Sequence, residues 1–183
     1  EEPPSALHFW ECEADRPGWE PIDGSGTCFV RRPNDATQYL LGCHHVLALT
    51  ETAPPPPPSQ LSQTSVRWEG NTLGVLAALP TPVDAIDAAL ARVTAGAPRP
   101  QVSFRPAGSS VAISDSLGPG EPPPTDVFVL TRRGTITATC IAEKDHTESY
   151  YGNGTRLTFT DVLHCTAAAG ELFEPGDSGA AIV

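Results

Sequence analysis

The sequence predicts an all-β fold in which short antiparallel strands close into barrels. Three observations indicate this class. Short runs of β-branched, aromatic and aliphatic residues recur along the 183-residue chain, glycine, proline and asparagine turn signals separate them at short intervals, and few segments have helical periodicity. Because an open antiparallel sheet exposes unpaired edges, such strands are expected to close on themselves.

The N-terminal half is predicted to begin with an arm and to continue with strands. Residues 1–22 hold Trp10 and Trp19 among prolines and acids, which indicates an arm that packs on the body through its aromatic side chains. Turn signals and apolar runs then predict short strands at residues 27–30, 38–43, 66–69 and 73–79, the last two joined by a turn at Gly70 and Asn71. Residues 83–93 are ambiguous between a helix and a buried strand.

Two proline-rich segments are expected to be loops. The five consecutive prolines from Pro54 to Pro58 predict an exposed, irregular or polyproline II segment. We favour a stiff surface loop there over a ligand for a proline-binding partner. Residues 97–124 are also loop-rich and are expected to connect two halves of the chain, with a short strand near residues 110–114.

The C-terminal half is predicted to form a second set of strands. Residues 127–142 have strand character on both sides of Gly134. Asn153 and Gly154 predict a hairpin turn, because this pair favours positive φ, and residues 156–163 form the expected return strand.

The segment at residues 175–179, Pro-Gly-Asp-Ser-Gly, indicates catalytic chemistry. Its glycines permit a tight turn and a close approach of backbone N–H groups to a ligand. The N–H groups of Gly176 and Ser178 could then stabilise a developing oxyanion, with Ser178 as the nucleophile. The alternative is an ordinary turn before an edge strand.

Several segments together resemble the chymotrypsin/trypsin-like serine proteases. Gly-Asp-Ser-Gly resembles the active-serine motif of that family, and the Gly-Ser-Gly strand, hairpin and His-Val succession before residue 47 resembles the region around its catalytic histidine. An aspartate leading into small and aliphatic residues at 84–90 resembles the strand that carries its catalytic aspartate. The Arg-Arg-Gly-Thr strand, hairpin and serine motif resemble the C-terminal barrel of bacterial-type members.

The resemblance implies a Ser-His-Asp triad in the order His, Asp, Ser. A serine hydroxyl needs a neighbouring base, usually histidine, and a carboxylate that holds the imidazole in the right tautomer. His45 fits the base best because Val46 follows it, and His44 is the alternative. Asp87 is favoured over Asp84 because the apolar run after it is longer.

The resemblance also implies an organisation into two six-stranded antiparallel barrels. We expect an N-terminal arm at residues 1–22, a first barrel carrying the histidine and aspartate at 23–96, an inter-barrel connection at 97–124, and a partial second barrel carrying the serine at 125–183. The chain stops five residues after Ser178, where the family usually continues for several strands. A partner or a C-terminal continuation is therefore expected to complete the second barrel.

Two further residue roles follow from the family pattern. The residue six before the serine often floors the substrate pocket; here it is Leu172, with Phe173 beside it, which predicts an apolar pocket. Asp177 precedes the serine, at the position that supports the oxyanion loop. In vertebrate trypsins a freshly cleaved Ile or Val amino terminus pairs with that aspartate, and because this chain begins Glu1-Glu2, another group is expected to order the loop.

The five cysteines allow two disulfides. Cys28 and Cys43 lie on the first predicted hairpin, and Cys140 and Cys165 lie on successive strands of the second half, so we predict these two pairs, with Cys12 free or paired elsewhere. The alternative, five buried thiols, stays open. No Cys-x-x-Cys, zinc spacing, phosphate loop or dinucleotide motif occurs, so no metal or cofactor is expected.

Composition and charge exclude several partners. The formal net charge of −11 argues against a nucleic-acid backbone, which requires basic patches. No apolar run approaches the roughly 18 residues of a transmembrane helix, so no membrane partner is expected. The first four residues, Glu-Glu-Pro-Pro, do not resemble a signal peptide. The compartment stays open, with secretion favoured.

These observations predict a serine endopeptidase that hydrolyses polypeptide substrates through an acyl-enzyme. A catalytically silent protease-like binding module is the main alternative, motivated by the missing C-terminal strands and the proline-rich loop. A β-sandwich interaction domain unrelated to proteases is the third; it predicts that His45 and Ser178 lie far apart.

Overall fold

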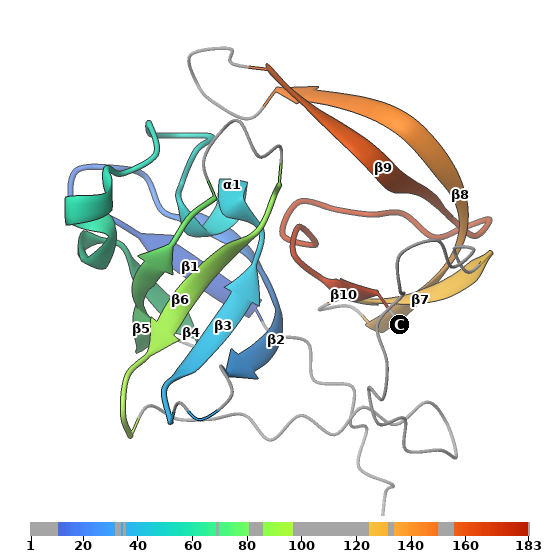
Figure 1. Cartoon of the computed structure of the whole chain (residues 1–183). Helices are drawn as coiled ribbons and strands as arrows, with labels where there is room; N and C mark the ends of the chain where they lie inside the picture. Colours follow the sequence, from blue (N-terminus) through green and yellow to red (C-terminus); the bar gives the residue numbers. More distant parts are fainter. Residues whose placement is uncertain are drawn as a thin grey trace, which may run out of the picture.

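The computed structural model has two β units (Figure 1). A closed barrel contains strands β1 to β6, and a four-stranded sheet contains β7 to β10. The structure describes residues 11–31, 34, 36–68, 70–80, 86–96, 125–131, 134–149 and 156–182. The all-β prediction is confirmed, with one closed six-stranded antiparallel barrel and a partial second sheet.

The barrel strands follow the order β1-β2-β3-β6-β5-β4, and β1 closes on β4. Every pairing in it is antiparallel. The strand bounds are Glu11–Asp15 (β1), Ile22–Arg31 (β2), Gln38–Gly42 (β3), Ser65–Trp68 (β4), Asn71–Ala78 (β5) and Ala89–Val93 (β6). The first predicted hairpin is therefore β2–β3, and Gly70, at φ +74°, makes the predicted turn between β4 and β5. In the segment at 83–93, which was ambiguous between helix and strand, residues 89–93 form strand β6.

The prediction of an arm at residues 1–22 is wrong for β1, which is a barrel strand. Cys12 and Ala14 are buried, so β1 has the alternating pattern of a strand with one face in the core. Glu13 and Asp15 alternate with them, and Arg67 on the neighbouring β4 pairs with both carboxylates, at 3.4 and 2.7 Å. Strand β1 is short and acidic, and its partner β4 lies far along the chain. For these reasons the alternation of buried and exposed residues is not evident in the sequence.

The barrel core holds buried aliphatic side chains from β3, β4, β5 and β6, among them Leu40, Val66, Leu73, Leu76 and Ala91. Helix α1 (His44–Leu47) follows β3, and all four of its residues are buried. A side chain at Gly24 on β2 would meet Val46, so this glycine lets α1 approach the barrel wall. Full burial of one leucine contributes about 1.5–3 kcal/mol, so the core anchors α1 firmly.

The proline-rich segment does not run as one extended stretch. A 3₁₀ helix, η1 (Pro58–Gln63), begins at the last of the five prolines, because proline is well tolerated in the first turn of a helix. Among the described residues, no helix is long and apolar enough to cross a membrane. The strand predicted near residues 110–114 and the turn at Asn153-Gly154 lie outside the described residues.

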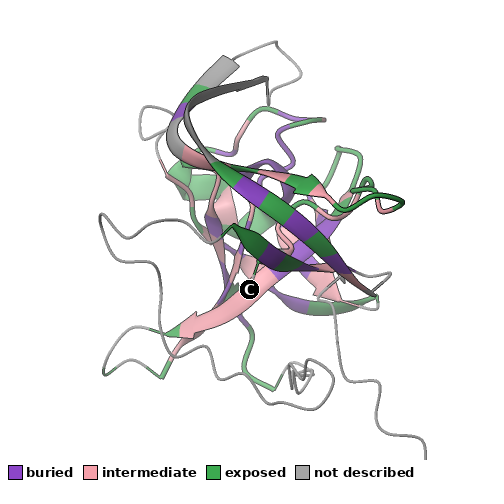
Figure 2. Ribbon diagram, turned by 90° about the vertical axis from the view of Figure 1, so that its right-hand side faces the viewer, coloured by how far each residue is buried: buried purple, intermediate pink, exposed green. Residues whose placement is uncertain are grey.

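The second sheet has the order β10-β7-β8-β9, all antiparallel. Its strands are Asp126–Thr131 (β7), Gly134–Ser149 (β8), Arg156–Ala167 (β9) and Ala181–Ile182 (β10). Buried Val127 and Val129 alternate with exposed residues on β7, and Figure 2 shows such alternation as purple and green bands. One face of this sheet is therefore packed and the other is open to solvent.

The disulfide predictions have opposite outcomes. Cys140 and Cys165 face each other across β8 and β9 and are bonded, as predicted. The predicted Cys28–Cys43 bond is wrong, since both residues lie outside any disulfide, as does Cys12. The register explains this, because Cys28 pairs with Leu41 and Cys43 lies beyond the end of β3. Bridged cysteines need Cα atoms close together and side chains directed at each other, which directly opposed residues such as Cys140 and Cys165 provide and this offset does not favour.

Candidate active site

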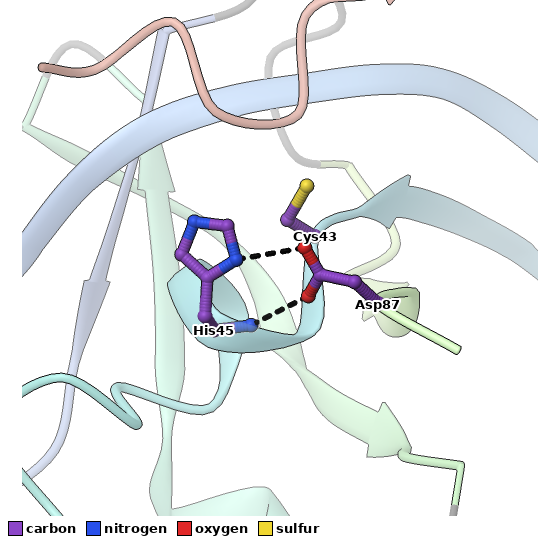
Figure 3. A group of neighbouring side chains, drawn as sticks. All are labelled: Cys43, His45 and Asp87. Atoms are coloured by element: carbon purple, nitrogen blue, oxygen red, sulfur yellow. Dashed lines mark hydrogen bonds and ion pairs between the residues drawn. The ribbon is translucent and has the colours of Figure 1, made fainter. Parts of the chain in front are cut away.

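His45 and Asp87 are joined by two hydrogen bonds (Figure 3). The backbone N–H of His45 donates to Asp87 Oδ1 at 3.1 Å, and His45 Nδ1 lies 2.8 Å from Asp87 Oδ2. The side chain of His45 is 10% exposed and that of Asp87 is 20% exposed. A carboxylate held at two points cannot rotate freely, so it fixes the orientation of the imidazole.

The barrel topology brings these two residues together across 42 positions of sequence. Strands β3 and β6 are antiparallel neighbours, and Gly42 at the end of β3 pairs with Ala89 at the start of β6. His45 follows the first of these residues within α1, and Asp87 precedes the second by two positions. Both side chains therefore lie at the same end of the barrel.

The electrostatics favour an ionised Asp87. Burial raises the pKa of this carboxyl group, but the hydrogen bonds from the His45 ring and backbone and the nearby His45 charge outweigh that effect, so its pKa lies below the ordinary value of 3.8. With a proton on Nδ1, the imidazole donates it to this ionised carboxylate. This arrangement leaves His45 Nε2 with a lone pair, as a general base requires.

The two alternatives weighed for these positions have different outcomes. His44 is the neighbour of His45 on α1 and is also buried, and burial lowers the pKa of its imidazole. The ring and backbone hydrogen bonds to Asp87 come from His45. Asp84 lies outside the described residues.

The loop that carries Ser178 docks on strand β2. The Ser25 N–H donates to the Ser178 carbonyl at 2.8 Å, and the Ser25 hydroxyl donates to the Gly176 carbonyl at 2.7 Å. The Thr27 hydroxyl donates to the Gly179 carbonyl at 2.7 Å. Ser178 itself is exposed. Three hydrogen bonds thus tie the predicted nucleophile's loop to the barrel wall, more than 150 residues earlier in the chain.

Gly179 brings this loop close to the histidine segment. Its φ is +89°, which L-residues rarely adopt, and a β-carbon there would collide with the Ser25 carbonyl oxygen and lie 3.4 Å from the Cys43 nitrogen. The residue after Ser178 therefore packs against the chain two positions before His45. Gly176 also has positive φ, at +96°, as expected for a tight turn.

Local bonds order the Ser178 loop. The Asp177 carboxylate accepts the Glu174 N–H at 2.9 Å, and the Asp177 N–H donates to the Glu174 carbonyl at 3.1 Å. Ala180 N–H donates to the Asp177 carbonyl at 2.9 Å. These turn bonds order the loop locally.

The predicted pocket residues lie beside the second sheet. Leu172 is 72% exposed and lines an open depression of about 350 Å³, together with Thr131, Thr135, Ile136, Gly170, Glu171 and Glu174. Phe173 is 43% exposed and does not belong to that lining. The lining is mixed rather than purely apolar.

Cys43 is a member of this site that the sequence did not reveal. Its sulfur lies within 4.8 Å of ligand atoms of His45 and Asp87, and its backbone nitrogen would lie 3.4 Å from a β-carbon at Gly179. Burial, followed by the negative charge of Asp87, raises the pKa of this thiol, so it stays protonated. Cys43 thus touches both the His45–Asp87 pair and the Ser178 loop. The only sequence signal was its position two residues before His45.

Comparison with known proteins agrees with the fold. No protein-family model and no curated protein matches the sequence. The structure is similar to the crystal structure of Protease A (TFPA) from Thermobifida fusca, with a TM-score of 0.55 and 20% sequence identity over 93% of this chain and 74% of that chain. At this identity the likeness defines the fold: the chain has the fold of a bacterial trypsin-like protease.

Proposed function

We propose that this protein is a serine endopeptidase whose triad is Ser178, His45 and Asp87. Ser178 Oγ attacks the scissile carbonyl carbon while its proton passes to His45 Nε2. His45 then protonates the leaving amine, and water hydrolyses the acyl-enzyme by the same steps in reverse. Asp87 holds the imidazole and stabilises the imidazolium, and the N–H groups of Gly176 and Ser178 donate to the oxyanion.

The observation that carries this proposal is the two-point contact between His45 and Asp87 at the end of the barrel where the Ser178 loop docks. A histidine buried against an ionised carboxylate can act as a general base only if the hydroxyl group whose proton it accepts lies nearby. The Gly179 contact with Cys43 supports such proximity. The polypeptide substrate is proposed from the protease-like fold.

Covalent labelling by a fluorophosphonate, measured by intact mass, tests the proposal. We expect the wild type to gain one adduct and Ser178→Ala to gain none. Ser62→Ala is the matched control, because Ser62 is exposed on η1, and it should label as the wild type does. Circular dichroism would establish that both variants are folded.

Wild-type protein without an adduct would contradict the proposal and favour the silent binding module. Labelling that persists in Ser178→Ala would assign the reactive group elsewhere.

A further inference from the structure

Three potential metal ligands of different chemistry meet at the base of the proposed triad. The Cys43 sulfur, a ring nitrogen of His45 and a carboxylate oxygen of Asp87 all lie within 4.8 Å of one another. Figure 3 shows the sulfur beside the carboxylate that contacts the imidazole. We propose that Cys43, His45 and Asp87 form a binding site for a divalent transition metal ion of the Zn²⁺ class, which switches the proposed hydrolase off reversibly.

The donor set selects the class of ion. Thiolate and imidazole ligands suit Zn²⁺, whereas Mg²⁺ and Ca²⁺ require oxygen ligands. From the usual bond lengths, the ligand atoms of a tetrahedral zinc site lie about 3.3–3.6 Å apart. Here His45 Nδ1 and Asp87 Oδ2 are 2.8 Å apart and all three atoms lie within 4.8 Å, so small side-chain movements suffice. The fourth position would hold water.

A neighbouring backbone group already holds one of the ligands. The His45 N–H donates to Asp87 Oδ1, which leaves Oδ2 directed at the imidazole. Outer hydrogen bonds of this kind orient metal ligands and are a regular part of metal sites.

The protons balance without any redox partner. Bonds form from the metal to sulfur, to one carboxylate oxygen and to His45 Nδ1. The Cys43 S–H bond breaks and its proton goes to solvent, since a coordinating thiol is deprotonated. The Nδ1 proton of the neutral imidazole moves to Nε2. The metal offsets the buried thiol's preference for its protonated form.

This last transfer gives the consequence for function, which rests on the triad proposed above. An imidazole with metal at Nδ1 and hydrogen at Nε2 has no lone pair left, so it cannot accept the Ser178 proton. Removing the metal restores the Nδ1–H tautomer and the base. The ion would therefore act as a reversible inhibitor and not as a cofactor.

The first test is a titration of the full chain, with the Cys140–Cys165 disulfide intact, with Co²⁺, followed by displacement with Zn²⁺. We expect visible absorption of tetrahedral Co²⁺ and a near-ultraviolet thiolate-to-cobalt band, both lost on Zn²⁺ addition. Cys43→Ala and Asp87→Asn should weaken binding by more than about 100-fold, because even outer partners are worth about 10–100-fold. The control is Cys28→Ala, which removes a thiol outside the cluster and should leave the spectrum unchanged.

A second variant guards against loss of folding. Cys43→Ser keeps a hydrogen-bond donor for Asp87 but lacks the soft sulfur, so it should fold and still lose the thiolate band. Absence of the band in wild type, or its survival in Cys43→Ser, would overturn the metal site.

Fluorophosphonate labelling with and without Zn²⁺ then tests the regulatory step. Zn²⁺ should slow wild-type labelling and a chelator should restore it. A Co²⁺ spectrum without labelling would sink the hydrolase and leave the metal site standing. Labelling that Zn²⁺ does not slow, in protein with a normal Co²⁺ spectrum, would overturn the inhibitory role.

Discussion

The barrel and the second sheet are held together in different ways. In the barrel every strand has two hydrogen-bonded neighbours, and a continuous core of aliphatic side chains fills the interior. The second sheet, within the described residues, ends at β9 on one side and at the two-residue β10 on the other. Its buried cluster is small, and the Cys140–Cys165 disulfide clamps its longest pair of strands.

The parts of the candidate site lie on these two different units. The His45–Asp87 pair is built on the closed unit, where β3, β6 and α1 are mutually packed. Ser178 belongs to the open unit, and its loop reaches the barrel through Ser25, Thr27 and Gly179. The barrel thus orients the proposed base, His45, by itself, whereas the position of the proposed nucleophile, Ser178, depends on docking between the two units.

The largest expected effect comes from Asp87→Asn, which acts on the closed unit. An amide in place of the carboxylate favours the wrong imidazole tautomer, so the rate of fluorophosphonate labelling should fall by about 10⁴-fold. Asp126→Asn is the control, because the Asp126 carboxylate lies on the second sheet, where it accepts a hydrogen bond from the Thr139 hydroxyl at 3.3 Å. Comparable labelling rates in Asp87→Asn and wild type would show that the dyad does not activate Ser178.

Gly179→Ala should break the docking while sparing both units. A methyl group there would collide with the Ser25 carbonyl, in addition to the roughly 1–2 kcal/mol of strain for an L-residue in the left-handed region. We expect labelling to drop to background. Gly170→Ala is the matched control, since Gly170 also has positive φ, at +91°, but open space around its β-carbon position. Equal labelling losses in both variants would attribute the effect to backbone strain rather than to docking.

Removal of the disulfide should destabilise the open unit selectively. Cys140→Ser combined with Cys165→Ser is expected to cost about 2–4 kcal/mol of unfolding free energy in the second sheet. Trp19 and Trp68 lie in the barrel unit, so their fluorescence should report a barrel transition close to that of wild type. Cys28→Ser serves as the control. If tryptophan fluorescence and far-UV circular dichroism lose signal together at a lowered temperature, the two units unfold as one.

The smallest expected effect concerns the docking hydroxyl. Ser25→Ala removes the 2.7 Å bond to the Gly176 carbonyl and should cost about 1 kcal/mol, with a modest loss of labelling rate. Ser65→Ala removes a comparable hydroxyl bond, to the Asp15 carbonyl at 3.3 Å, within the barrel. It should lower the melting temperature without slowing labelling. A slower labelling rate in both variants would argue that general stability, and not docking, sets the reactivity.

The sequence by itself determined the fold class and most of the strands. Alternating apolar runs and glycine turns are local signals, so the β2–β3 hairpin, the turn at Gly70 and the strand character around Gly134 were all visible. The cross-strand Cys140–Cys165 bond followed from two successive strands. The choice of His45 and Asp87 required the family resemblance as well, because neither residue has a distinctive local pattern.

Only the tertiary structure decided which distant residues meet. Strand β1 lies in an acidic segment and was not predicted as a strand. Its pairing with β2 and β4 depends on barrel closure, which no local pattern encodes. The offset between Cys28 and Cys43 depends on the β2–β3 register and the irregularity within it, and it removed a predicted disulfide. The same geometry places the Cys43 sulfur within 4.8 Å of ligand atoms of His45 and Asp87. Local residue preferences determine the strands and turns, whereas barrel closure and strand register determine which side chains become neighbours.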